Sequence, residues 1–151
     1  MAYWRLQYHL VWATTLRQPL ISADTARVIE QALYRKAREL GITIHQVGGV
    51  EDHIHVVASI PPRVAVAACL QQFKGASSYA VNSDLHHATR FRWQDGYGVL
   101  TLGESSLGRV IDYVRRQREH HATGELLPAL EQCEPPVSSL PGVPGATNSR
   151  T

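Results

Sequence analysis

Two histidines separated by one residue are the first side chains in this sequence whose type and spacing could do chemistry. His53 and His55 lie in residues 50–60, a run rich in β-branched residues that stops at two prolines. Side chains alternate between the faces of a strand, so both imidazoles project from the same face. Neutral imidazole is a common ligand of divalent cations, and the pair supplies half of a metal site. An isolated pair more often lies on a half-exposed strand, so other residues must decide.

A tyrosine and a glutamine supply the second half of this chemistry. Residues 107–121 carry apolar side chains at helical spacing, and Ser105 or Ser106 is the predicted N-cap. Tyr113 and Gln117 fall one turn apart on the flank of the apolar stripe, where they can face the sheet without entering the core. Asp52 adjoins the histidines, and we expect it to orient one of them.

The elements that must position these residues alternate between strands and helices. We predict strands at residues 4–14, 42–47, 50–60 and 99–102, and helices at residues 22–40, 64–81 and 107–121. This order predicts an α+β, ferredoxin-like β-α-β-β-α-β antiparallel sheet with an additional C-terminal helix. The first and third strands are then central neighbours, which would bring Arg5, Gln7 and His9 beside the two histidines.

Basic and aromatic side chains interleave in the polar loop 83–98. Arginine can pair with phosphate and aromatic rings can stack on bases, so such a loop suits single-stranded nucleic acid. Trp93 and Tyr97 could equally anchor the loop to the core, and the lysine of the second helix could be a plain surface residue. The predicted DNA contacts are Arg5, Gln7, His9, Lys74, Arg90, Arg92, Trp93 and Tyr97.

Length and composition indicate a single domain that contains these motifs. The chain has 151 residues and a formal net charge of +2. We expect a domain at residues 1–122 and a Pro/Gly/Ser-rich, disordered tail at residues 123–151. There is no long apolar run, signal-peptide pattern or disulfide framework, so we expect a cytoplasmic protein without a membrane partner.

The motifs together resemble a known family. His53-Ile54-His55 is similar to the histidine–hydrophobe–histidine motif of the HUH nucleases. Residues 93–99, the run Tyr113-Val114-Arg115-Arg116-Gln117 and the pair His120-His121 resemble the single-tyrosine transposases of the insertion-sequence 200/605 type. Residues 8–12 and 73–75 also resemble that family. The resemblance spans about residues 3–121, nearly the whole predicted domain.

The resemblance implies a transposase that cuts and rejoins single-stranded DNA at hairpin-bearing element ends. Tyr113 would be the nucleophile and would form a 5′-phosphotyrosine, while His53, His55 and Gln117 would bind Mg²⁺ or Mn²⁺. It also implies a homodimer, commonly with the tyrosine helix of one chain completing the site of the other, and no nucleotide cofactor. The predicted strand 99–102 has no charge or proline to prevent edge pairing, so we expect dimerisation there.

Three alternatives stay open on the sequence. A domesticated relative that nicks repeated palindromic elements would have the same residues. A non-catalytic nucleic-acid-binding module would not need Tyr113, Gln117 and both histidines together. Another His-x-His metalloenzyme is a third alternative. A metallo-β-lactamase would need Asp-His shortly after the two histidines, but Val56-Val57-Ala58-Ser59 follows, and a two-histidine phosphoesterase would need a second His-x-Ser/Thr strand motif, which the predicted strands lack.

Overall fold

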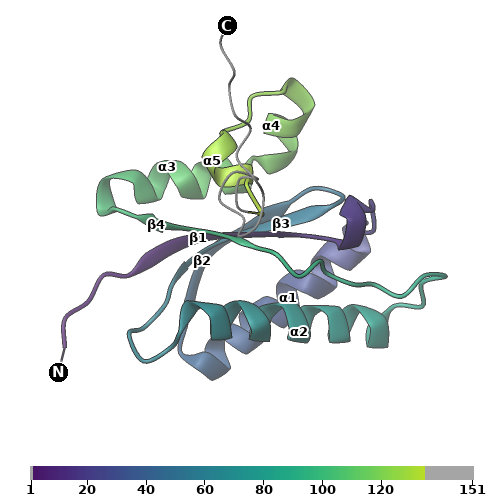
Figure 1. Cartoon of the computed structure of the whole chain (residues 1–151), viewed down its shortest axis with the longest axis horizontal. Coiled ribbons are helices and arrows are strands. Elements are labelled where there is room, and N and C mark those ends of the chain that lie inside the picture. Colours follow the sequence, from purple (N-terminus) through teal and green to yellow (C-terminus); the bar gives the residue numbers. More distant parts are fainter. Residues whose placement is uncertain (1, 135–151) are drawn as a thin grey trace, which may run out of the picture.

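A four-stranded antiparallel sheet in the order β2-β3-β1-β4 lies at the centre of the structure, a computed structural model that describes residues 2–134 (Figure 1). The strands are β1 (Gln7–Ala13), β2 (Thr43–Gly49), β3 (His53–Ser59) and β4 (Gly98–Leu102). The helices are η1 (Thr15–Arg17), α1 (Ala23–Leu40), α2 (Val66–Asp84), α3 (Glu104–Arg115), α4 (Gln117–Thr123) and α5 (Pro128–Glu131). The predicted α+β class, element order, neighbouring β1 and β3 and edge position of β4 are confirmed.

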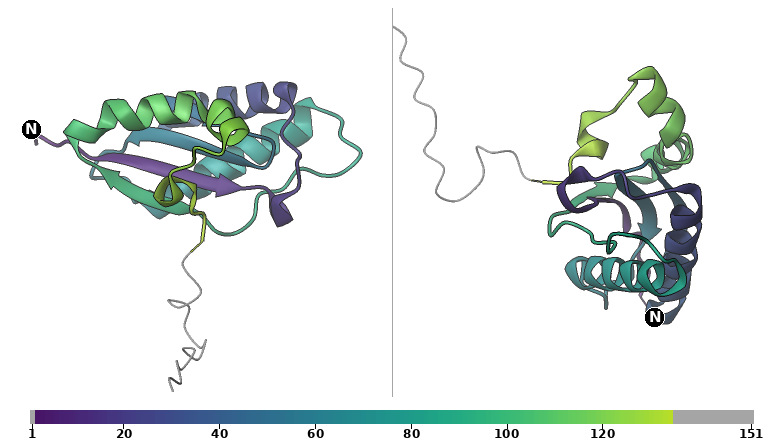
Figure 2. Two further views of the ribbon diagram at one scale, coloured as in Figure 1. Left: turned by 90° about the horizontal axis from the view of Figure 1, so that it is seen from above. Right: turned by 90° about the vertical axis from the view of Figure 1, so that its right-hand side faces the viewer.

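Helices α1 and α2 cover one face of the sheet, and α3, α4 and α5 cover the other (Figures 1 and 2). Ser22 caps α1 by accepting a hydrogen bond from the Thr25 N–H, and Gly41 ends it at φ 70°, a left-handed conformation that glycine adopts without strain. The main core lies between the sheet and α1/α2. Its fully buried side chains include Leu10, Trp12, Ile29, Leu33, Val56, Leu70 and Phe73.

Strand β1 alternates as predicted but is shorter. Leu10 and Trp12 pack into the α1/α2 core, while His9 and Val11 face the other helical layer. The strand begins at Gln7 rather than at residue 4, because its partners β3 and β4 end opposite Gln7 at Ser59 and Leu102. Before Gln7, the Leu6 carbonyl oxygen still accepts a hydrogen bond from the Ile60 N–H at 3.0 Å, but the paired register with β3 and β4 begins at Gln7.

The predicted last helix is two helices. Gly103, not Ser105 or Ser106, is the N-cap of α3, and Arg116 at φ −100° and ψ 25° separates α3 from α4. Tyr113 consequently lies in the last turn of α3, and Gln117 is the first residue of α4.

Gly48 of β2 and Gly75 of α2 differ in the room around them. Gly48 permits close packing of α3 on β2, since a Cβ there would lie 2.0 Å from the Val114 carbonyl oxygen. The register of β2 against β3 shifts nearer its start, between Ile44 and Gln46. Gly75, in the middle of α2, has nothing within 4 Å of such a Cβ.

The segment after α4 departs furthest from expectation. We expected disorder from residue 123 onward, but the chain turns at Gly124, forms α5 and buries Leu130 and Cys133 against the sheet. Glu131 in this segment contacts Tyr113, Gln117, His53 and His55, and these contacts help to hold the segment on the domain. The expectation for residues 135–151 lies outside the described residues. Within residues 2–134, no helix combines the length and apolar character that a membrane crossing requires.

Candidate active site

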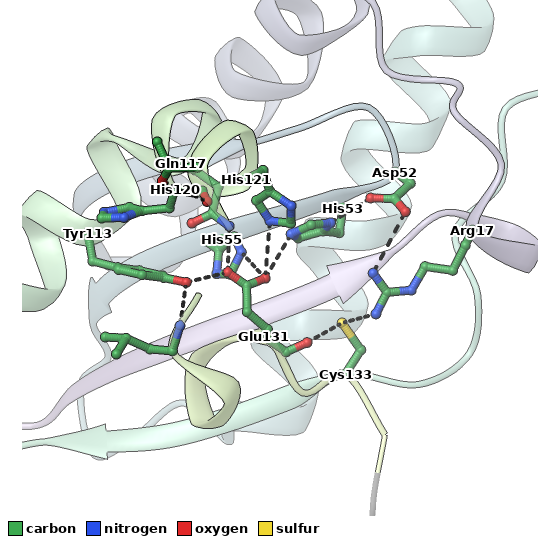
Figure 3. Close-up of polar contacts among 12 residues, drawn as sticks. Arg17, Asp52, His53, His55, Tyr113, Gln117, His120, His121, Glu131 and Cys133 are labelled. Carbon is green, nitrogen blue, oxygen red and sulfur yellow. Dashed lines mark hydrogen bonds and ion pairs between the residues drawn. The ribbon is translucent and has the colours of Figure 1, made fainter. Parts of the chain in front are cut away.

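His53 and His55 are the centre of a buried polar cluster on the face of the sheet beneath α3, α4 and α5 (Figure 3). The two residues are 1% and 0% exposed, and their ring centroids are 4.9 Å apart. The predicted common orientation of the two imidazoles is thus confirmed. Burial of two polar rings requires partners.

Each histidine is held through its Nδ1 atom by a different residue. Asp52 Oδ1 lies 2.6 Å from His53 Nδ1, and His9 Nε2 lies 2.8 Å from His55 Nδ1. A partner at Nδ1 sets the tautomer and leaves Nε2 to bind a ligand. The contact expected of Asp52 is therefore present, and His9 does for His55 what Asp52 does for His53.

Tyr113 and Gln117 lie over the histidines in the same chain. The Tyr113 ring centroid is 6.3 Å from that of His55, and the side chains of Tyr113 and Gln117 are 4% and 1% exposed. His120 stacks on the Tyr113 ring with centroids 4.4 Å apart. The four residues that the sequence singled out come together.

The cluster has a fifth member, Glu131 of α5, which the sequence did not predict. Its Oε1 accepts hydrogen bonds from the Tyr113 hydroxyl at 2.5 Å and the Gln117 amide at 2.6 Å. Its Oε2 lies 3.0 Å from His53 Nε2 and 3.2 Å from His55 Nε2. Pro128 at the start of a short apolar stretch is the only local signal of α5, and nothing local places Glu131 beside residues so distant in the chain.

Burial and the contacts within the cluster shift the pKa values of Glu131, His9 and Tyr113. Burial opposes the charged form of Glu131, but its contacts with His53 and His55 hold its pKa well below the usual range. Burial, and secondly the neighbouring His55, lowers the pKa of His9 to about 3, so His9 is neutral. Burial and the hydrogen bond to Glu131 raise the pKa of Tyr113 to about 12, so its hydroxyl keeps its proton.

The donor set fits a divalent cation. Atoms of His53, His55 and Glu131 that could bind a metal lie within 4.8 Å of one another. His53 Nε2, His55 Nε2 and Gln117 Oε1 are buried and have no hydrogen-bond partner with acceptable geometry. Buried polar atoms left in this way carry a free-energy cost, which a bound cation would remove. Mixed nitrogen and oxygen ligands suit Mn²⁺ and accept Mg²⁺.

The predicted DNA contacts do not form one group. Arg90, Arg92 and Tyr97 are exposed on the loop between α2 and β4, and Arg5 pairs with Glu104 before β1. Trp93 packs edge-on against Trp12 and donates to Ser77, so it anchors that loop. Lys74 donates to the carbonyl groups of residues 94–96. Gln7 and His9 are buried, 5% and 0% exposed.

Comparison with known proteins assigns the chain to a family. Residues 2–117 match the family described as "Transposase IS200 like". The chain belongs to the IS200-like transposases. It is 30% identical over 129 residues to the transposase for insertion sequence element IS200 of Salmonella typhimurium, covering 82% of this chain and 84% of that protein. It is 23% identical over 121 residues to the ISDra2 transposase TnpA of Deinococcus radiodurans, covering 77% and 86%.

Solved structures share the fold of this IS200-like transposase. A crystal structure of a candidate transposase from Deinococcus radiodurans R1 matches with a TM-score of 0.60 at 23% identity, over 78% of this chain and 95% of that one. A REP-associated tyrosine transposase bound to a REP hairpin matches with a TM-score of 0.62 at 12% identity, over 80% and 74%. The predicted family is confirmed, and with it transposase function, which entails cutting and joining DNA strands.

Proposed function

We propose that this IS200-like transposase cuts and rejoins single-stranded DNA through a covalent link to Tyr113. The observation that carries the proposal is the meeting of the Tyr113 hydroxyl, both histidines and Gln117 in one buried cluster. A purely structural tyrosine would not need two histidines with unpartnered Nε2 atoms beside it.

The strand cut follows from the chemistry of the phenol. The Tyr113 oxygen attacks phosphorus, the bond from phosphorus to the 3′ oxygen breaks, and a 5′-phosphotyrosine and a free 3′-hydroxyl result. Tyr113 loses one proton and the departing oxygen gains one; Glu131 Oε1 is the acceptor closest at hand, at 2.5 Å from the hydroxyl. Because the covalent link conserves the bond, another 3′-hydroxyl can reverse the step without a nucleotide cofactor.

His53, His55 and the Gln117 side-chain oxygen would hold the divalent ion, Mg²⁺ or Mn²⁺. When bound, the ion supplies a Lewis acid that polarises the phosphate and steadies the leaving oxygen. Asp52 and His9 would keep the two imidazoles turned toward it. A Lewis acid would matter here because the pKa of Tyr113 is raised to about 12, which makes the free phenol a poor nucleophile.

The DNA substrate is proposed to carry a hairpin at the element end. One structural relative is bound to a REP hairpin, which supports a folded single strand as partner but fits a domesticated, palindrome-nicking role equally well. Arg90, Arg92 and Tyr97 are the exposed candidates for contacts with it, and Arg5 lies at the other end of the sheet. Oligonucleotides from the flanks of the gene and from dispersed palindromes would separate the two roles.

We further propose a homodimer formed through β4, the edge strand next to β1. The resemblance implied that the tyrosine helix would complete the partner's site. Here Tyr113 lies against His55 of its own chain, an arrangement that supports a site built within each subunit. Mixing Tyr113→Phe with a His53→Ala, His55→Ala chain tests this: cleavage regained by the mixture would require exchange of the helices.

A covalent adduct is the test of the proposed function. The protein is incubated with single-stranded DNA and Mn²⁺ and run on a denaturing gel. We expect an adduct with the natural chain and with Tyr79→Phe, whose side chain is 75% exposed on α2, but none with Tyr113→Phe. Tyr113→Phe should still bind DNA in a mobility-shift assay.

An adduct of full yield in Tyr113→Phe would remove Tyr113 as the nucleophile. DNA binding without any adduct in the natural chain would instead favour the non-catalytic binding module.

A further inference from the structure

We infer that Glu131 of α5 is a direct ligand of the catalytic cation, beside His53 and His55. The inference rests on the proposed metal site and adds a ligand from beyond residues 2–117, the part of the chain that matches the family. The segment carrying it would then be part of the active site.

The distances between the donor atoms support a shared ion. Glu131 Oε2 lies 3.0 Å from His53 Nε2 and 3.2 Å from His55 Nε2. Around a cation with bonds of about 2.1 Å, neighbouring donor atoms are about 3.0 Å apart at right angles and about 3.4 Å apart in a tetrahedron. The two observed distances are in this range.

The directions of the same atoms argue against a simple ion pair. At 3.0 and 3.2 Å an N–H donor aligned with the carboxylate would form a normal hydrogen bond. Neither Nε2 atom has such a bond, although both are buried. The Nε2 atoms of His53 and His55 are thus close to Glu131 Oε2, but their N–H directions do not point at it. This is the geometry expected when all three atoms are directed at one cation between them.

The other carboxylate oxygen is held so that Oε2 faces the histidines. Oε1 accepts from the Tyr113 hydroxyl and the Gln117 amide, while Oε2 has His53, His55 and, at 3.5 Å, His121 around it (Figure 3). Glu131 would therefore connect the cation to the nucleophile.

The residues on both sides of Glu131 pack against the domain, so the position of its carboxylate is fixed by the packing of the segment. Leu130 is 6% exposed in the apolar cluster with Val57, Val110 and Val114, and Cys133 is 3% exposed against Val11 and Ala13. The Gln132 carbonyl oxygen lies so close to β4 that a Cβ on Gly98 would be 1.9 Å from it. This close approach requires glycine at position 98.

Binding of Mn²⁺ in the absence of DNA tests the inference. Free Mn²⁺ is counted by electron paramagnetic resonance during titration of the full chain. Glu131→Gln keeps the shape and the uncharged polar atoms but loses the anionic donor, so we expect an affinity at least about tenfold weaker. Glu125→Gln removes the same charge from an exposed position of the same segment and should bind as the natural chain does.

The outcomes separate this inference from the proposed function. If Glu131→Gln and Glu131→Ala both bind Mn²⁺ as tightly as the natural chain, Glu131 only occupies the site and the inference is wrong. If His53→Ala also binds normally, the proposed metal site itself is wrong. Circular dichroism of each variant checks that the fold is retained, and partial recovery by Glu131→Asp supports a ligand rather than a packing role.

Discussion

At the scale of single residues, the cluster shows how two histidines on the same face of a strand are oriented by different partners. A carboxylate next in sequence, Asp52, holds His53, whereas a neutral histidine from the neighbouring strand, His9, holds His55. We predicted His9 as a DNA contact. Its complete burial and its bond to His55 favour a positioning role instead.

The positioning role of His9 predicts a metal-binding defect. His9→Leu leaves His55 Nδ1 without a partner, so Mn²⁺ affinity should fall by about 10–100-fold. His9→Gln retains an acceptor and should recover part of the loss. His86→Gln, on the exposed loop after α2, is the control and should change nothing. Equal losses in the Leu and Gln variants would mean that His9 matters only for packing.

At the scale of elements, the position of Tyr113 depends on how closely α3 packs on β2. The contact is made through backbone, since Gly48 lies against the Val114 carbonyl group. Tyr113 is adjacent to Val114, so any shift of this contact moves the nucleophile.

Replacing Gly48 by alanine should therefore weaken both the fold and the site. Its Cβ would clash with backbone that cannot rotate away, so we expect a loss of about 1–3 kcal/mol in unfolding free energy, as for other overpacked sites. Gly75→Ala is the matched change in the open middle of α2 and should add about 0.5–1 kcal/mol. Urea unfolding measures both, and adduct yield should fall in Gly48→Ala alone. A Gly48→Ala chain as stable as the natural one would contradict this packing.

At the scale of the whole molecule, β4 is an edge strand with few of the usual protections. Its residues carry no charge or proline, and Leu100 and Thr101 are exposed. The docked segment around Gln132 covers the Gly98 end of its face and leaves this edge as the candidate for pairing.

Light scattering tests the proposed dimer. The natural chain should have the mass of two chains at micromolar concentration, and Thr101→Lys should shift the equilibrium toward one chain, because charge on an edge strand opposes pairing. Lys36→Thr on α1, away from β4, should have no effect on the mass. A single-chain mass for the natural protein at all concentrations would exclude the dimer.

Short-range pattern determined much of this protein. Alternation at period two placed His53 and His55 on one face, and helical spacing with Ser22 and Gly41 defined α1, because these features depend only on neighbours along the chain. The family motifs then indicated which residues act together. The tertiary structure decided what depends on distant contacts: the break at Arg116, the bond from His9 to His55, and the packing of Trp93. Above all it decided Glu131, because a carboxylate on a proline-bounded four-residue helix has no local pattern, and only folding brings it to its histidines.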